Sequence, residues 1–138
     1  MNWLMPKDKP HNGGQWTVAK FNSFIKGGLR SLSNRWGPKF ACKKAAWVKR
    51  GVYRCAGYLC EPHLVPATLP PKPGNKKRID NAVVDHVSPV VPVTGFTTWD
   101  VIIKNMFCEV GGLQVLCHEC HSRKTQEEQN NRKKNNAG

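Results

Sequence analysis

Between residues 15 and 36 the apolar side chains recur every three or four positions, the spacing that gathers side chains on one face of an α-helix. These positions are Phe21, Phe24, Ile25, Leu29, Leu32 and Trp36. Basic side chains fall between them, at Lys20, Lys26, Arg30 and Arg35. The pattern predicts an amphipathic helix that packs one face on a core and turns the other toward phosphate. Gly27 and Gly28 are expected to weaken or kink it.

A second helix is predicted over residues 39–50, where apolar residues alternate with lysines after Gly37 and Pro38 have ended the first helix. Residues 15–50 therefore form an N-terminal helical region. The preceding residues 1–14 hold two prolines and a glycine pair without periodicity, which indicates a flexible basic arm.

Short runs of β-branched and other apolar residues predict three strands, at residues 52–55, 82–87 and 113–116. Residues 61–77 contain five prolines and are expected to be an irregular loop, and residues 88–95 form a second such connection.

Two more helical segments complete the pattern. Residues 99–107 form a short amphipathic helix after two threonines that can cap it, and the polar segment from 118 to about 130 is compatible with a helix. The mixture predicts an α+β core over residues 51–130 with long irregular loops. Residues 131–138 are expected to be a disordered basic tail.

The net charge of the chain indicates the class of its binding partner. Lys and Arg total 22 against 9 Asp and Glu, a formal net charge of +13. Such an excess favours nucleic acid, because neutralising phosphates releases counterions. The alternative is a solvated basic surface, although soluble domains usually carry a net charge of only about 2–8. With no apolar run of about 18 residues and no secretion signal, we expect a cytoplasmic protein without a membrane segment.

The six cysteines indicate metal binding rather than disulfides in a cytoplasmic chain. Cys117 and Cys120, at C-x2-C spacing, can hold one tetrahedral zinc from a tight turn, and Cys55 and Cys60 offer a second pair. His63 is an alternative ligand in place of Cys55 or Cys60. The competing interpretation treats Cys55 and Cys60 as small buried hydrophobes. Two cysteines without a partner at metal spacing are expected to be core thiols: Cys42 and Cys108.

Asp85 and His86 are neighbours on an otherwise apolar strand. Adjacent residues of a strand point to opposite faces, so a site that uses both needs the strand to end or twist there, which Ser88 and Pro89 permit. An isolated Asp–His pair is more often structural, but His121, directly after Cys120, changes that balance.

These residues together resemble the HNH (ββα-metal) endonuclease family. Its pattern is a Val-Asp-His strand, a Leu-Gln-x-Leu-Cys strand and a helix that opens with Cys-x-x-Cys-His, found here at residues 84–86, 113–117 and 117–121. The chain is most similar to the small HNH nucleases common in bacteriophage genomes, several of which are homing-type enzymes. The resemblance covers residues 30–128, including the Arg-Trp-Gly-Pro-Lys run at 35–39.

The resemblance implies a zinc-braced ββα core that hydrolyses DNA, double-stranded DNA first of all, to 5′-phosphate and 3′-hydroxyl ends. His86 is then the general base, and Asp85 and His121 hold a divalent cation, magnesium or manganese, with nickel or zinc as alternatives. Arg123 and Lys124 follow His121 and are expected to contact the phosphate backbone, as are the four basic residues of the first helix. His118 is a further ligand, a phosphate contact or simply an exposed residue.

The chain departs from the family pattern in two places. Gly112 stands where relatives have the Asn that hydrogen-bonds across the ββα loop, and Asn105 is the nearest substitute. Cys55 and Cys60 have four residues between them where relatives have two.

Two other functions remain open. A non-catalytic zinc-containing DNA-binding module would share the charge and the cysteines but has no need of Asp85, His86 and His121 together. An RNA-directed nuclease would differ only in substrate.

Overall fold

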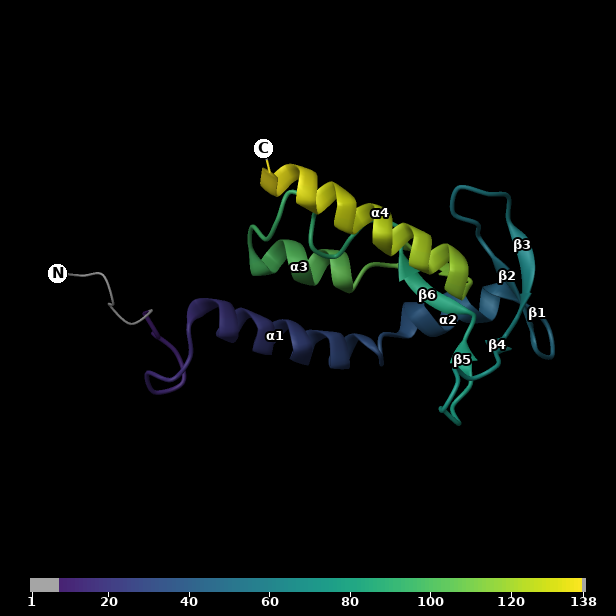
Figure 1. The fold of residues 1–138 in the computed structure, drawn as a ribbon, viewed down its shortest axis with the longest axis horizontal. Helices are drawn as coiled ribbons and strands as arrows, with labels where there is room; N and C mark the ends of the chain where they lie inside the picture. Colours follow the sequence, from purple (N-terminus) through teal and green to yellow (C-terminus); the bar gives the residue numbers. More distant parts are fainter. Residues whose placement is uncertain (1–7, 138) are drawn as a thin grey trace. The chain divides into compact units, whose positions relative to one another are not determined.

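The computed structural model describes residues 8–137, and the chain divides into two units, Met1–Arg35 and Trp36–Gly138. Figure 1 shows the order of the elements along the chain. Residues 1–7 of the predicted flexible arm lie outside the described residues.

The first unit is built on α1 (Val18–Ser33). The Thr17 hydroxyl caps the helix by accepting from the backbone N–H of Lys20 at 3.1 Å. The segment before it is folded back, because His11 pairs with Trp16 in a β-bridge and its ring stacks on Phe21 with centroids 4.0 Å apart. Residues 11–14 are therefore ordered against the helix rather than part of a loose arm.

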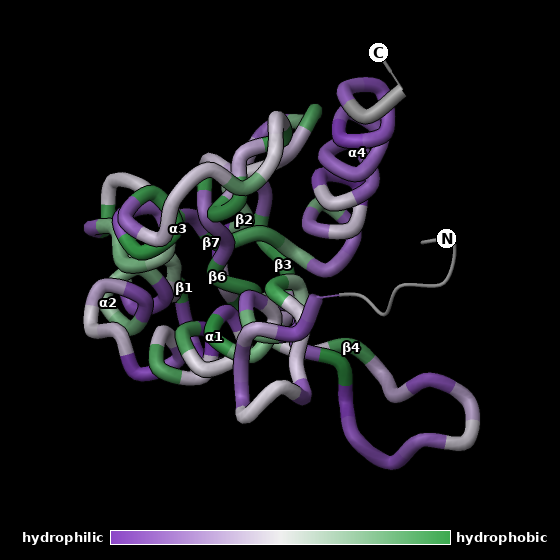
Figure 2. Tube along the Cα trace, turned by 90° about the vertical axis from the view of Figure 1, so that its left-hand side faces the viewer, coloured by the Kyte–Doolittle hydropathy of each residue, from purple (hydrophilic) through white to green (hydrophobic). Residues whose placement is uncertain are grey.

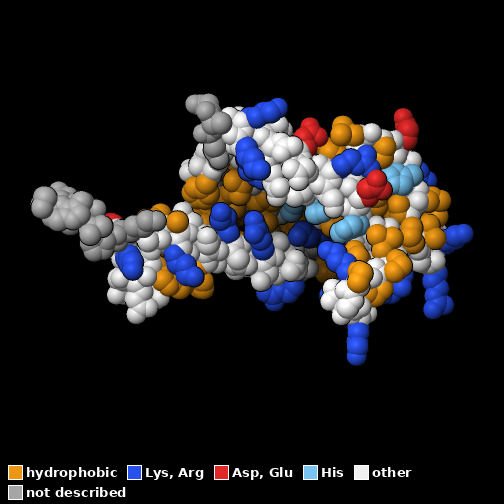
Figure 3. Space-filling model, in the orientation of Figure 1, with side chains coloured by type: hydrophobic (Ala, Val, Ile, Leu, Met, Phe, Trp, Pro, Cys, Tyr) orange, Lys and Arg blue, Asp and Glu red, His pale blue; other side chains and the backbone are white. Residues whose placement is uncertain are grey.

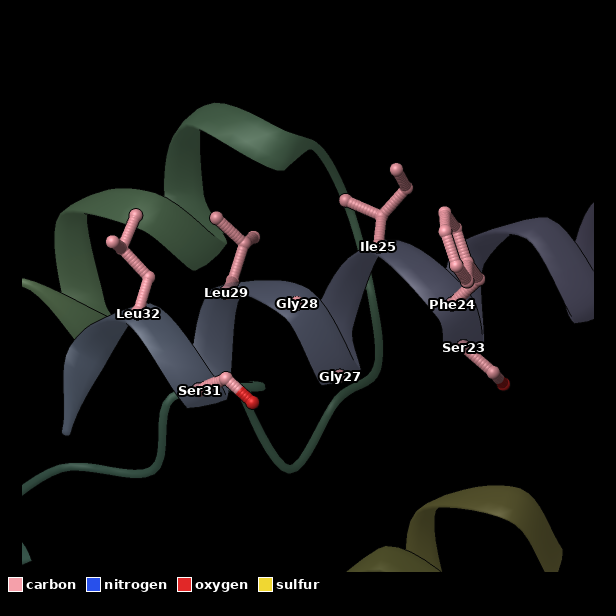
Figure 4. A pocket seen from close by; sticks show the side chains of 8 residues that line it. All are labelled: Ser23, Phe24, Ile25, Gly27, Gly28, Leu29, Ser31 and Leu32. Atoms are coloured by element: carbon pink, nitrogen blue, oxygen red, sulfur yellow. The ribbon is translucent and has the colours of Figure 1, made fainter.

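The apolar stripe predicted for α1 is present. Figure 4 shows its apolar side chains pointing to one side of the helix and Ser23 and Ser31 pointing to the other. The helix is shorter than predicted at both ends, and it runs continuously through Gly27 and Gly28.

The second unit begins with α2 (Gly37–Ala46), which carries Pro38 in its first turn. A three-stranded antiparallel sheet follows, in the order β1 (Trp47–Lys49), β2 (Val52–Cys55) and β3 (His63–Pro66). The predicted helix over 39–50 is thus wrong beyond residue 46. The chain turns back at Gly51, whose φ of +77° suits glycine, and this turn pairs β1 with β2.

The predicted loop over 61–77 is also wrong in part, because it contains β3 and β4 (Thr68–Leu69). Pro66 lies on β3, an edge strand of its sheet, where a missing N–H need not interrupt pairing. The short strand β4 pairs with β5 (Ile79–Asp80).

The next strand pair confirms two predicted strands. It joins β6 (Val83–His86) to β7 (Leu113–Leu116) in antiparallel register, with Asp85 opposite Gln114 and His86 opposite Leu113. Along the chain, β6 is followed by α3 (Trp99–Met106), which Thr98 caps, and by the 3-10 turn η1 (Val110–Gly112), before β7 begins.

The last helix, α4 (His118–Ala137), continues through the residues predicted to be a disordered tail. Two side chains near its end are tied to the irregular segment that follows β6. Arg132 donates to the carbonyl of Val91 at 2.7 Å, and Asn135 donates to that of Val93 at 3.1 Å. Tertiary hydrogen bonds thus hold a segment whose composition alone indicated disorder.

The β6–β7 pair lies between α2 and α4 (Figures 1 and 2). Two buried clusters hold these layers together. One contains Cys42, Ala82, Leu113 and Val115, and the other contains Cys55, Val65, Leu116, Cys117 and Cys120. Tyr53 packs against both. Because α2 packs on β6 and β7, it belongs to the core unit, and the predicted boundary at residue 50 moves to residue 36.

Within residues 8–137, no helix has both the length and the apolar character needed to cross a bilayer.

Gly112 marks a tight contact in this core. A Cβ built at this position would lie 2.9 Å from the Cys108 Sγ and 3.2 Å from its Cβ, so any larger residue collides with that side chain. The carbonyl of Gly112 accepts from the backbone N–H of Val87 at 2.9 Å, which closes the ends of β6 and β7. The side chain of Cys108 therefore occupies the space that a larger side chain at position 112 would need.

We predict that Gly112→Ala lowers the free energy of unfolding by about 1–2 kcal/mol in urea titrations, because the new methyl overpacks the Cys108 side chain. Gly111→Ala is the matched control, since nothing lies within 4 Å of a Cβ there. Adding Cys108→Ala to Gly112→Ala should recover most of the loss. Additive losses in the double variant would contradict this steric explanation.

Candidate functional site

Four potential metal ligands from distant parts of the chain meet in one place. The ligand atoms of Cys55, His63, Cys117 and Cys120 all lie within 4.8 Å of one another. Thiolates bound to one tetrahedral zinc are about 3.8 Å apart, because each Zn–S bond is about 2.3 Å long. The Cys117 Sγ lies 3.8 Å from the His63 Nε2, which fits this geometry.

Strand register brings the four ligands together. Cys55 at the end of β2 is the cross-strand partner of His63 at the start of β3, so the two side chains share one face of the sheet. Ala56 N–H donates to the carbonyl of Val115 at 2.8 Å and thereby joins the end of β2 to β7. Cys117 follows β7 directly, and Cys120 lies in the first turn of α4.

Backbone N–H groups point at the sulfur atoms. The Cys55 Sγ accepts from Cys117 N–H at 3.2 Å and from Gly57 N–H at 3.3 Å, and the Cys117 Sγ accepts from Cys120 N–H at 3.5 Å. Such donors favour the thiolate over the thiol. The sulfur environment therefore suits a cation.

The His63 ring is also oriented so that one of its nitrogens can bind a metal ion. Its Nδ1 lies 3.0 Å from the carbonyl of Glu61, which can only accept, so Nδ1 carries the proton and Nε2 is left as the ligand atom facing Cys117. Metal-binding histidines usually have such a hydrogen bond on the other ring nitrogen. The residues present thus fit a Cys3His site for a metal such as zinc.

The sequence predicts Cys60 as the fourth ligand, with His63 as an alternative to Cys55 or Cys60, and the structure groups His63 with the three other cysteines. The reason is the longer C-x4-C turn, which uses left-handed backbone at Gly57 and Leu59 and leaves Cys60 exposed. Its Sγ still lies 3.7 Å from that of Cys120, a distance two ligands of one zinc could have. Cys60 is therefore a neighbour of the Cys3His cluster.

The ionisation of these thiols differs. Burial raises the pKa of Cys120 to about 12. Burial acts in the same direction on Cys117, but hydrogen bonds from the Cys120 backbone and from His63 outweigh it and bring the pKa of Cys117 below its usual value. A hydrogen bond to the backbone at Glu61 raises the pKa of His63. Metal binding at these thiols would therefore displace the proton of Cys120.

A second cluster lies between β6, β7 and α4. The Oδ1 of Asp85 is 3.5 Å from the Nε2 of His121, and its Oδ2 accepts from Gln114 at 3.3 Å and from the Lys124 ammonium at 2.7 Å. The Asp85 carboxylate thus contacts both its neighbouring strand β7 and helix α4.

Lys124 differs from its predicted role as a phosphate contact. Only 7% of it is exposed, and its ammonium donates to Asp85, to the carbonyl of His86 at 2.6 Å and to Glu128 at 3.0 Å. Burial would lower its pKa, but the hydrogen bonds to Asp85 and Glu128 outweigh burial and raise it. Because its three donors are used inside the protein, Lys124 holds Asp85 in place.

Arg123 points away from Asp85, toward the cysteines. Its guanidinium donates to the carbonyl of Tyr58 at 3.2 Å and lies 3.5 Å from Glu119 and 3.8 Å from the Cys120 Sγ. The group is partly exposed, and in this arrangement it supports the turn between Cys55 and Cys60.

The His86 ring and the Asp85 carboxylate are held by contacts with different elements. Its Nε2 lies 2.8 Å from the carbonyl of Met106, so this nitrogen carries the proton and Nδ1 is left as an acceptor. Asp85 contacts α4, whereas His86 contacts the end of α3, as alternation along a strand requires. The structure thus joins Asp85 to His121 and orients His86 separately. Figure 3 shows histidine side chains exposed on this face of the molecule.

The basic residues predicted to face phosphate from the first helix belong to the first unit: Lys20, Lys26, Arg30 and Arg35. The Lys20 ammonium lies 5.7 Å from the Trp16 ring. His118 opens α4 in the second unit, where its backbone N–H donates to the Asn81 Oδ1 at 2.9 Å.

Sequence reasoning missed Asn81, which is only 4% exposed. Its amide also donates to the carbonyl of Pro66 at 2.9 Å, so one side chain ties the start of α4 to the end of β3. The available signal was a polar residue directly before a β-branched run.

No protein-family model, curated protein or solved structure matches the chain. Its function is therefore inferred from the geometry of the two clusters.

We predict about one zinc per chain after dialysis, measured by elemental analysis. Cys55→Ser and His63→Ala should each lose it and lower the melting temperature, because each removes a ligand of the Cys3His cluster.

Cys60→Ser is the matched control and should keep its zinc, since Cys60 is exposed and outside that cluster. Zinc lost from Cys60→Ser but kept by His63→Ala would assign the site to four cysteines instead. A folded protein without zinc would reject the site altogether.

We also predict that Lys124→Met destabilises the protein by about 3–5 kcal/mol in denaturant titrations, because it leaves the Asp85 carboxylate without its buried partner. Lys133→Met, an exposed position on the same helix, should change stability by less than about 0.5 kcal/mol. Equal effects of the two substitutions would show that the Lys124 contacts contribute little.

Proposed function

We propose that the chain is a metal-dependent endonuclease of the HNH (ββα-metal) type that hydrolyses DNA. One observation carries the proposal: an antiparallel strand pair followed directly by a helix sets Asp85 of β6 opposite His121 of α4, with Oδ1 and Nε2 3.5 Å apart. This is the order of elements and residues on which the family resemblance rests.

Asp85 and His121 would hold the divalent cation, which when bound stabilises the charge on the departing 3′-oxygen of the phosphodiester. Because these two residues supply only a carboxylate and an imidazole, the cation would have further coordination positions open to water and phosphate oxygens. The ligands suit magnesium or manganese, and the imidazole also admits nickel or zinc.

His86 is the proposed general base. Because its Nε2 donates to the carbonyl of Met106, its Nδ1 has a free lone pair that can take a proton from the attacking water. The neutral form of an imidazole can accept that proton. The Met106 contact fixes both the tautomer and the ring plane.

Lys124 and Gln114 are positioning residues in this scheme. Both bind the Oδ2 of Asp85, which leaves Oδ1 directed at His121. Lys124 also binds the carbonyl of His86, so one ammonium locks the backbone of the base and the carboxylate of the metal ligand.

The Cys3His cluster would brace the same helix. Cys117 and Cys120 precede His121 within about one turn, so a zinc bound there would set the rotation of α4 and hence the direction of His121. The cluster and the catalytic pair thus share one short segment of chain.

A different amide stands near the place of the missing motif Asn. Asn105 donates to the carbonyl of Val90 at 3.1 Å and so braces the segment after β6. We propose that Asn105, together with the backbone bond from Val87 to Gly112, steadies the connection that relatives hold with the motif Asn.

A non-catalytic zinc-containing DNA-binding module is the second candidate. The observation that favours it is the buried ammonium of Lys124 on Asp85, because it partly neutralises the carboxylate that a cation would need. In that function Asp85, His86 and His121 would be structural.

A plasmid-nicking assay with added magnesium or manganese separates the two functions. We predict metal-dependent cleavage by the wild-type protein, and a loss of about 10²–10⁴-fold in His86→Ala, because the general base is removed. Asp85→Ala and His121→Ala should lose metal-stimulated cleavage. His118→Ala, a matched histidine substitution in the same helix, should keep most of it.

DNA binding should survive in His86→Ala, which separates a catalytic defect from a folding defect. Full cleavage by purified His86→Ala would reject the mechanism. Binding without cleavage by the wild-type protein under any metal would favour the DNA-binding module.

A further inference from the structure

An aromatic and basic surface lies on α2, β1 and β2, none of which carries a residue of the Asp85–His121 cluster. Phe40, Lys43, Lys44, Trp47 and Tyr53 line an open hollow of about 370 Å³ there. Phe40 is 63% exposed and Trp47 is 53% exposed, which is unusual for side chains of this size. We call these five residues the aromatic–basic surface.

The spacing along the chain explains how the surface forms. Lys43 and Lys44 lie three and four residues after Phe40, and Trp47 lies four and three residues after them, so the four side chains make one stripe along α2 and its C-terminal end. The opposite stripe, with Cys42 and Ala46, packs in the buried cluster against Leu113 and Val115. The exposed stripe is therefore turned outward by the same packing that anchors the helix.

Strand register adds Tyr53 to the stripe. Trp47 on β1 is the cross-strand partner of Tyr53 on β2, so their side chains lie on one face of the sheet. Tyr53 packs against both buried clusters and is held rigidly. The Lys43 ammonium lies 5.6 Å from the centroid of the Tyr53 ring, a cation–π contact.

The charge of this region has one sign. From Lys9 to Cys60 the sequence has no Asp or Glu, while lysines and arginines recur throughout. Within residues 8–137, neither Lys43 nor Lys44 has a carboxylate partner. The surface is thus complementary to a polyanion that also carries flat rings able to stack on Phe40 and Trp47.

We propose that the aromatic–basic surface binds a single-stranded or locally unpaired stretch of nucleic acid, with bases stacked on Phe40 and Trp47 and phosphates on Lys43 and Lys44. Exposed aromatic rings give stacking platforms that any base can use, and lysines between them follow the backbone. A protein partner would use the rings, and only an acidic one would also match Lys43 and Lys44. This proposal rests on the proposed nuclease function and adds a second contact between the protein and its substrate strand. Binding at the surface can be measured without cleavage.

The test uses the full-length chain carrying His86→Ala, so that the probe stays intact. The probe is a fluorescein-labelled oligothymidylate of roughly twelve nucleotides, within the length that a single stacking domain covers. Fluorescence anisotropy gives its dissociation constant at several salt concentrations, alongside a duplex of the same length and heparin, a polyanion without bases.

We expect Phe40→Ala and Trp47→Ala each to weaken oligothymidylate binding by roughly 5- to 100-fold, because each removes a stacked base. Heparin binding should change little in these variants. The Lys43→Gln and Lys44→Gln double variant should weaken binding of both ligands. It should also flatten the salt dependence by about 0.7 in slope for each phosphate that a lysine no longer neutralises.

Phe96→Ala is the matched aromatic control, because Phe96 is 39% exposed and lies before α3, outside the aromatic–basic surface. Oligothymidylate binding that is the same in Trp47→Ala, Phe40→Ala and Phe96→Ala would overturn the proposal. Self-association of the wild-type chain that Trp47→Ala abolishes, with unchanged oligothymidylate binding, would make the surface a protein interface instead.

The outcomes separate this proposal from the nuclease. Stacking-dependent binding, together with a wild-type chain that cleaves no DNA under any metal, would support the surface and reject the endonuclease. Metal-dependent cleavage in Trp47→Ala with unchanged single-strand affinity would support the endonuclease and reject the surface.

Discussion

The close approach of Cys55, His63, Cys117 and Cys120 is the constraint on which most of the core unit depends. It joins the β2–β3 hairpin to the junction of β7 and α4 across a long stretch of chain. Thiolates gathered this closely repel one another, so the fold needs a cation or protons there. Because Cys117 lies directly before α4, the cluster also determines where that helix begins and which of its side chains face β6.

The second organising contact is the ammonium of Lys124. It is buried against Asp85, Glu128 and the carbonyl of His86, and it connects α4 to β6, the strand that carries Asp85 and His86. The contact explains why Asp85 can be held with one oxygen directed at His121. It also keeps the charge near neutrality around a carboxylate that would otherwise be poorly solvated.

Local patterns predicted much of this fold correctly. The β-branched runs became β6 and β7, and the three-and-four spacing became α1 and α3. The errors share a cause: residues 47–50, 63–69 and 131–137 take their structure from partners elsewhere in the chain. Pro66 and the polar end of α4 both violate local preference and are held by strand pairing or by hydrogen bonds to a distant loop.

The sequence by itself determined which chemical groups were available: four cysteines for a metal with His63 as an alternative ligand, and Asp85, His86 and His121 as a candidate catalytic set. Only the tertiary structure decided their grouping. The β2–β3 register pairs Cys55 with His63 and not with Cys60. Packing of α4 on the β6–β7 pair buries the side chain of Lys124. Residue spacing limits how far apart two ligands lie along the chain, but strand register and helix rotation decide whether they face one another.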